Sequence, residues 1–195
     1  MRKVIRIGVA LVIMATLIVG YYYYLSRKTS DGSTSNKSES VTEYAMLKNT
    51  DLDKNYPKTP RTVIKMYNRI ITEFYAKKHS DAEIEILAGK ARKLMDSDLL
   101  KANPKDTYFE GVKKDIKSYS DRKARIISSD VENSSYIEYK TVKGYECAYA
   151  EAYYFSKEGS NFLRTYQNYC LRKDKDGNWK ILTWKVVDGD PDNFE

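Results

Sequence analysis

"YECAYAEAYYFSKEGSNFLRTYQNYCL", residues 145–171, alternates alanines with larger side chains before a short polar break and continues with a second run rich in Tyr, Phe and Leu. Such alternation is typical of β-strands, in which successive side chains point to opposite faces of a sheet. The break, residues 157–160, holds a glycine that suits a turn. We therefore expect an antiparallel hairpin of strands 145–156 and 162–171.

A four-residue loop over 157–160 predicts which residues of this hairpin lie opposite each other. Ser156 would pair with Asn161, and Cys147 would then face Cys170. Directly opposed residues of an antiparallel pair have Cα atoms ~4.5 or 5.5 Å apart, and disulfides tolerate roughly 4.4–6.8 Å. A Cys147–Cys170 disulfide is thus feasible, and the alternative is two buried thiols that stay reduced.

The same pairing sorts the hairpin into two faces. One face carries the alanines with Leu163, Thr165 and Tyr169, and this face would allow a helix to approach closely. If the other face lines a pocket, it offers stacking rings, an acid and a cation for a small ligand or a glycan. If it is the outer face, its residues form ordinary cross-strand pairs or a dimer interface. The candidate ligand-binding residues are Tyr149, Glu151, Tyr153, Arg164 and Tyr166.

The rest of the chain extends this pattern in both directions. Strand-like runs are expected over 124–131, 136–142 and 179–187, and Asp176-Gly177 is a strong hairpin signal. Before residue 122 the apolar residues recur at helical spacing. Helices are predicted from Pro60, after Ser80 and after Asn103-Pro104, with a short helical turn around residues 99–100. Helices followed by a meander predict an α+β fold, with about three helices on one face of a curved antiparallel sheet.

Two stretches carry a resemblance to a known fold. "NYPKTPRTVIKMYNRI", residues 55–70, and "YQNYCLRKDKDGNWKILTWKV", residues 166–186, resemble the nuclear transport factor 2-like superfamily. They also resemble an uncharacterised membrane-anchored family of low-GC Gram-positive bacteria within it. The resemblance covers roughly residues 50–187. It implies a pocket between sheet and helices and, often, dimerisation through the sheet, but no single activity.

The amino-terminal segment suggests a membrane anchor. Residues 7–25 are uncharged, and as a helix of ~1.5 Å rise per residue they would span about 28 Å, close to the hydrocarbon core of about 30 Å. Tyr21 to Tyr24 would form a collar of rings at the lipid headgroups. Basic residues before the segment place the amino terminus in the cytoplasm and the rest outside the cell. The alternative is an unusually long export signal that is cleaved.

Residues 29–40 are rich in serine, which predicts a tether. We therefore expect a cytoplasmic stub with anchor at 1–28, a linker at 29–55 and an extracytoplasmic domain at 56–195. Five basic residues flank the anchor, which leaves 29 basic against 27 acidic residues elsewhere. This balance argues against a nucleic-acid partner, because a nucleic-acid-binding domain carries its own clustered basic charge.

Catalytic motifs are sparse. His79 is the only histidine and is expected in an exposed loop, and no calcium or zinc motif has the required spacing. We predict no catalytic residue, no metal and no cofactor. The function predicted is an envelope binding or assembly module for an unknown envelope component or small ligand. The alternatives are an isomerase or lyase that uses Glu151 with Tyr153 or Tyr166, and a purely structural module that forms a homodimer through the sheet.

Overall fold

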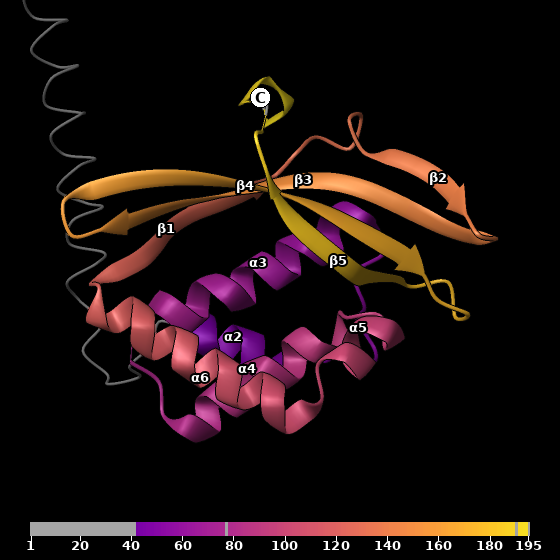
Figure 1. Ribbon diagram of the computed structural model, residues 1–195. Coiled ribbons are helices and arrows are strands. Elements are labelled where there is room, and N and C mark those ends of the chain that lie inside the picture. The colour runs from indigo at the N-terminus through magenta and orange to yellow at the C-terminus, as the bar shows by residue number, and fades with distance from the viewer. Residues whose placement is uncertain (1–41, 77, 190, 195) are drawn as a thin grey trace, which may run out of the picture. The chain divides into compact units, whose positions relative to one another are not determined.

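In the part of the chain that the structure describes, five helices cover one face of an antiparallel sheet, which confirms the predicted α+β class (Figure 1). The computed structural model describes residues 42–76, 78–189 and 191–194. The helices are α2 (Glu43–Asn49), α3 (Pro60–Ala76), α4 (Asp81–Lys93), α5 (Ser97–Ala102) and α6 (Lys105–Asp121). The strands are β1 (Ala124–Val131), β2 (Glu138–Val142), β3 (Tyr145–Glu158), β4 (Asn161–Lys173) and β5 (Trp179–Val187), followed by the 3₁₀ helix η1 (Pro191–Phe194).

Strand β3 organises the sheet, because it pairs with three other strands. The order is β1-β3-β4-β5, and β2 also pairs with β3. Strand β1 lies beside residues 152–158 of β3, whereas β2 lies beside residues 145–149. Strands β1 and β2 thus follow each other along one edge of β3 instead of pairing as a simple meander would. In Figure 1 the long strands bend, and helices α2 to α6 lie on one side of the sheet.

The predicted register of the β3–β4 hairpin is wrong by two residues. The turn consists of Gly159 and Ser160, so that Glu158 pairs with Asn161. Gly159 has a φ of +58°, a conformation that two-residue hairpin turns require and that glycine adopts without steric cost. Cys147 therefore faces Arg172, Cys170 faces Tyr149, and both thiols are free. Because the shift is an even number of residues, every side chain keeps its predicted face.

The helix starts agree with their capping signals. Helix α4 begins with a capping box in which Ser80 and Glu83 bond each other's backbone. Helix α3 starts at Pro60, as predicted from the proline. Helix α2 was not predicted, and its Leu47 belongs to the hydrophobic core together with Leu52. Among the described residues, the packed domain thus begins with α2, ahead of the boundary expected at residue 56.

The core lies between α3 and the helix-covered face of the sheet, called the inner face. Ala148, Ala150 and Ala152 of β3 are fully buried there, and they leave room for the buried Val63 and Ile64 of α3. Close packing of this kind fills the interior with few voids. The opposite face, called the outer face, is approached by η1 (Figure 1).

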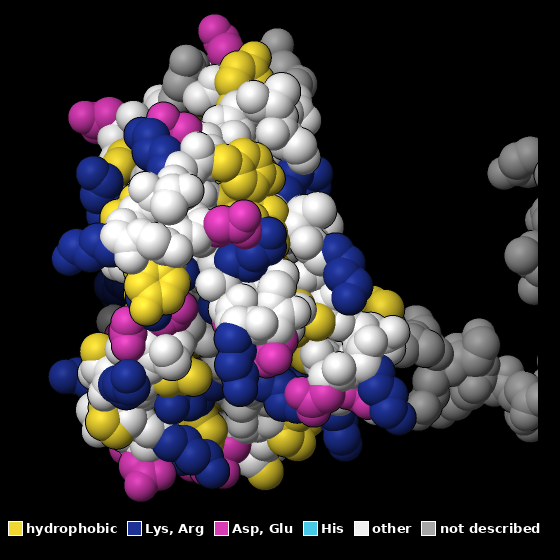
Figure 2. All heavy atoms as spheres, turned by 90° about the vertical axis from the view of Figure 1, so that its right-hand side faces the viewer, with side chains coloured by type: hydrophobic (Ala, Val, Ile, Leu, Met, Phe, Trp, Pro, Cys, Tyr) yellow, Lys and Arg dark blue, Asp and Glu magenta, His cyan; other side chains and the backbone are white. Residues whose placement is uncertain are grey.

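No helix among residues 42–76, 78–189 and 191–194 is long and apolar enough to cross a bilayer. The predicted anchor, residues 7–25, and most of the predicted linker lie outside the described residues. On the side shown in Figure 2, basic and acidic side chains are interspersed, and they form no continuous basic patch there.

Candidate functional site

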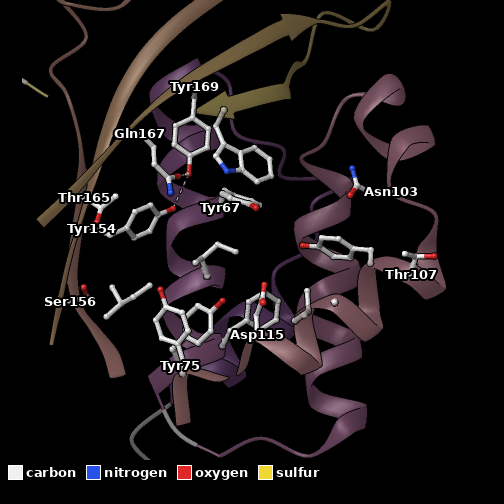
Figure 3. Close-up of a pocket in the computed structure, with 18 residues that line it drawn as sticks. Tyr67, Tyr75, Asn103, Thr107, Asp115, Tyr154, Ser156, Thr165, Gln167 and Tyr169 are labelled. Atoms are coloured by element: carbon white, nitrogen blue, oxygen red, sulfur yellow. Dashed lines mark hydrogen bonds between the residues drawn. The ribbon is translucent and has the colours of Figure 1, made fainter. Parts of the chain in front are cut away.

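A pocket of about 560 Å³ opens between the inner face of the sheet and helices α3 and α6 (Figure 3). This volume falls within the range of small-molecule sites, about 300–1,000 Å³. Eight of the eighteen lining residues are aromatic: Tyr67, Phe74, Tyr75, Tyr108, Tyr119, Tyr154, Tyr169 and Trp184. Aromatic residues are therefore the most numerous class in the lining, and the pocket is called the aromatic chamber below.

The periodicity of the helices and strands explains which residues line the pocket. Tyr67, Ile71 and Phe74 lie on one side of α3, because residues three and four apart share a helix face. Tyr108, Gly111 and Asp115 do the same on α6. The sheet contributes alternate residues such as Tyr154 and Ser156 from β3, and Thr165, Gln167 and Tyr169 from β4. Figure 3 shows these strand residues across the chamber from Asp115 and Asn103.

The deepest tyrosines are held by a hydrogen-bond network (Figure 3). The Tyr154 hydroxyl lies 2.6 Å from Asn68 Oδ1 and 2.9 Å from the Tyr169 hydroxyl, which lies 2.8 Å from Gln167 Oε1. The Tyr154 hydroxyl donates its proton to Asn68 Oδ1, and the Tyr169 hydroxyl donates its proton to Gln167 Oε1. Both phenol protons are thereby used within the protein. A ligand would meet the rings and lone pairs of Tyr154 and Tyr169 instead of free donors.

Burial raises the pKa of five tyrosines in the pocket and keeps them neutral. It raises the pKa of Tyr108 to about 12 and raises the pKa values of Tyr75 and Tyr154 still further. The pKa values of Tyr67 and Tyr169 also lie well above the ordinary range for the same reason. Desolvation disfavours the charged form of a group, so none of these phenols supplies a tyrosinate base near neutral pH.

Asp115 is the only Asp, Glu, Lys, Arg or His side chain among the lining residues, and it is exposed. Two arginines sit against lining rings without lining the pocket themselves. The guanidinium carbon of Arg92 lies 5.4 Å from the centre of the Tyr108 ring, and that of Arg122 lies 4.9 Å from the centre of the Tyr119 ring. The wall of the chamber thus carries one formal negative charge.

The candidate residues predicted from the sequence lie on the outer face, away from this pocket. The structure brings three of them together: the Arg164 guanidinium lies 4.7 Å from the Tyr153 ring centre, and the Tyr153 and Tyr166 rings are 6.2 Å apart. Phe194 of η1 covers both rings, at 5.0 Å from Tyr153 and 5.9 Å from Tyr166. This aromatic cluster is held by the chain's own carboxyl-terminal turn.

The other two predicted residues have separate surroundings. Tyr149 lies beside Cys170, whose thiol forms a hydrogen bond with the phenol and helps to raise its pKa. The backbone N–H of Glu151 donates to Glu132 Oε1 at 2.9 Å, while Glu151 Oε2 is buried without a hydrogen-bond partner among the described residues. Desolvation raises the pKa of the buried Glu132. Neither Tyr149 nor Glu151 reaches the aromatic pocket.

His79 is buried, in contrast to the exposed position that was predicted. Its Nε2 lies 3.2 Å from Glu73 Oε1 and 3.0 Å from the Glu73 carbonyl oxygen, and its ring packs against Tyr44. Glu73 is also buried. A histidine here provides the partner that a buried carboxylate requires, so its role is to join α2, α3 and α4.

The pocket itself was missed, although its residues carried a signal. Tyr67 and Phe74 on α3, and Tyr108 and Tyr119 on α6, belong to apolar stripes that read as ordinary core. Six tyrosines on two helices and two strands exceed what a dry core readily accommodates, because each buried hydroxyl needs a partner. This excess of tyrosine was the signal in the sequence that could have indicated a pocket.

Residues 1–184 match a family described as "Domain of unknown function (DUF6715)". The chain belongs to this family. The matched region includes the predicted anchor and ends within β5, so that η1 lies beyond it. No curated protein matches the chain. Within the described residues, no three His, Cys, Asp or Glu side chains come together as a metal site would require.

Proposed function

We propose that this protein is a membrane-anchored binding module that holds a small ligand outside the cytoplasm. The proposal rests on the aromatic chamber between α3, α6 and the inner face. In this chamber the hydroxyls of Tyr154 and Tyr169 form hydrogen bonds within the protein. Convergent apolar surface with a few polar groups is the usual form of a ligand site. Residues 7–25 would hold the module in the bilayer at the cell envelope.

The proposed fold is nuclear transport factor 2-like. Its support is the arrangement of helices on one face of a bent sheet with a pocket between the two layers, together with the closing hairpin of β4 and β5. A fold of this kind does not decide an activity, so the function must be argued from the pocket.

The positions of the carboxylates favour a binding function over isomerase or lyase chemistry. Proton transfer of that kind uses a carboxylate whose pKa is tuned by a desolvated site. The one carboxylate in the chamber, Asp115, is exposed, and the phenols are neutral. The predicted acid Glu151 lies on the outer face.

Two helix glycines allow a direct test. An added Cβ meets no atom within 4 Å at either Gly111 of α6 or Gly89 of α4, but only Gly111 lines the pocket. Gly111→Leu should fill the chamber and remove binding, while Gly89→Leu should leave binding unchanged. The full chain in a neutral detergent would be screened against a set of ring compounds by thermal shift and by tryptophan fluorescence, to which Trp184 of the pocket contributes together with Trp179.

We expect compounds that stabilise the wild type and Gly89→Leu but not Gly111→Leu. A set of compounds that binds all three proteins equally, or none of them, would contradict the pocket proposal. The anchor is tested separately: protease added to intact cells should digest residues 42–195, and a secreted product without residues 1–25 would refute it.

A further inference from the structure

The charge distribution in the chamber favours a positively charged ligand over an anion. An aromatic ring carries a negative face, which attracts cations and repels anions. Eight such rings line the pocket, together with the single carboxylate of Asp115 and no Lys, Arg or His. An anion placed here would meet repulsion from both kinds of group and would lose its hydration.

The hydroxyl groups reinforce this bias. Anions are bound by donors, and the protons of Tyr154 and Tyr169 are already used in the network with Asn68 and Gln167. The hydroxyls of Tyr67 and Tyr108 also bond to each other. These four tyrosines therefore offer a ligand ring surface and oxygen lone pairs, both of which suit a positive charge. The donors that the lining keeps, such as those of Thr107, Thr165 and Gln167, are uncharged.

The protein's own cations show that these rings accept a positive partner. Arg92 and Arg122 lie over Tyr108 and Tyr119 respectively. Arg92 is further engaged by the carbonyl oxygen of Asn103 at 2.6 Å, and Arg122 by Glu158 at 2.9 Å. Over the other six rings, no Lys or Arg from the described part of the chain is in cation–π contact. Of these six, Tyr75 and Trp184 are partly exposed, so their rings can meet a cation that enters from outside.

We propose that the chamber binds a compact organic cation of the alkylammonium class, with its charged head among the tyrosine rings and Asp115 as the opposing charge. The inference rests on the proposed function, because it names the ligand class of the same pocket. Alkylammonium groups suit the site better than Na⁺ or K⁺, since their weakly hydrated surface can replace water contacts with aromatic contacts.

A pair of molecules with the same shape isolates the charge. Choline and 3,3-dimethylbutan-1-ol differ in that a carbon replaces the charged nitrogen. Titration of the full chain in a neutral detergent by calorimetry should show choline binding about tenfold more tightly, which corresponds to about 1.4 kcal/mol. Added salt should weaken choline binding and leave the alcohol unaffected, because screening acts on the charge.

Asp115→Asn tests the opposing charge, with Asp106→Asn as the matched control. Both residues lie on α6 and both changes remove one negative charge, but Asp106 does not line the pocket. Asp115→Asn should weaken choline binding several-fold without changing the affinity for the alcohol, and Asp106→Asn should change neither affinity.

Each other result would overturn the inference. Equal affinities for the two molecules, or equal effects of the two substitutions, would show that charge does not select the ligand. Binding of the alcohol alone would reject a cation but retain the pocket. If neither molecule binds, the cation class is rejected, and the comparison of Gly111→Leu with Gly89→Leu against ring compounds separately decides whether the pocket binds anything.

Discussion

The two faces of β3 and β4 consist of alternating residues of the same strands, yet helices cover the inner face and only the carboxyl-terminal turn η1 approaches the outer face. On the inner face three alanines let α3 pack against the sheet, and further along β3 the larger Tyr154 and the polar Ser156 border the chamber. On the outer face Tyr153 and Tyr166 are covered by Phe194. The comparison teaches that tyrosine content alone does not locate a site. A site forms only where the element that packs over the tyrosines leaves a cavity above them.

The largest difference between the faces should appear in stability. Tyr169 is fully buried on the inner face, so Tyr169→Ala should lower the free energy of unfolding by ~3–5 kcal/mol. Tyr166→Ala, three residues away on the outer face, should cost less than half as much because Tyr166 is only partly buried. Urea unfolding of the full chain in detergent measures both values. Equal losses would mean that the outer cluster is as well packed as the core.

A smaller effect concerns the buried carboxyl of Glu132, which accepts a hydrogen bond from the backbone N–H of Glu151. Because burial raises the pKa of Glu132, the folded state holds this proton more tightly than the unfolded state. Stability should therefore fall as pH rises from the ordinary range of a glutamate through the raised pKa of Glu132. Glu132→Gln keeps an oxygen that can accept the Glu151 N–H, and it should remove this loss.

The urea midpoint of unfolding, measured between pH 4 and 8, gives the slope of stability against pH for the wild type and for Glu132→Gln. Glu138→Gln, at an exposed position on β2, is the control and should keep the wild-type slope. A Glu132→Gln protein that is less stable than wild type at neutral pH, or that has the same slope, would contradict the assignment.

The smallest effect is expected at the two cysteines. Their thiols are free and their residues are offset by two positions, so a reducing agent should leave the unfolding midpoint unchanged. A disulfide would instead contribute about 2–4 kcal/mol that reduction removes. The intact mass of the protein without reductant checks the same point. A mass lower by two hydrogens together with a lower midpoint on reduction would restore the bridge predicted from the sequence.

Local signals predicted much of the fold. The bounds of β1 and β5 are those expected. Helix α3 begins at the predicted Pro60, and α4 begins directly after its N-cap Ser80. Such features depend on neighbours a few residues apart, so sequence spacing is enough to find them. Helix α2 escaped notice because it has only seven residues and one buried side chain, too few for a periodic pattern.

The candidate site was much less predictable. The partition of the β3–β4 hairpin into two faces was correct, but the interpretation placed ligand residues such as Glu151 on the face that η1 approaches. His79 was misplaced for a similar reason, because its partner Glu73 becomes buried only when three helices meet.

From the amino-acid sequence alone follow the periods of the helices and strands, the helix caps and the alternation that divides the sheet into two faces, because these arise from neighbouring residues along the chain. Only the tertiary structure decided the length of the β3–β4 turn, which face the helices cover, and the chamber between α3, α6 and the sheet. A cavity depends on how closely whole elements approach one another, and that distance is set by side chains far apart in the chain.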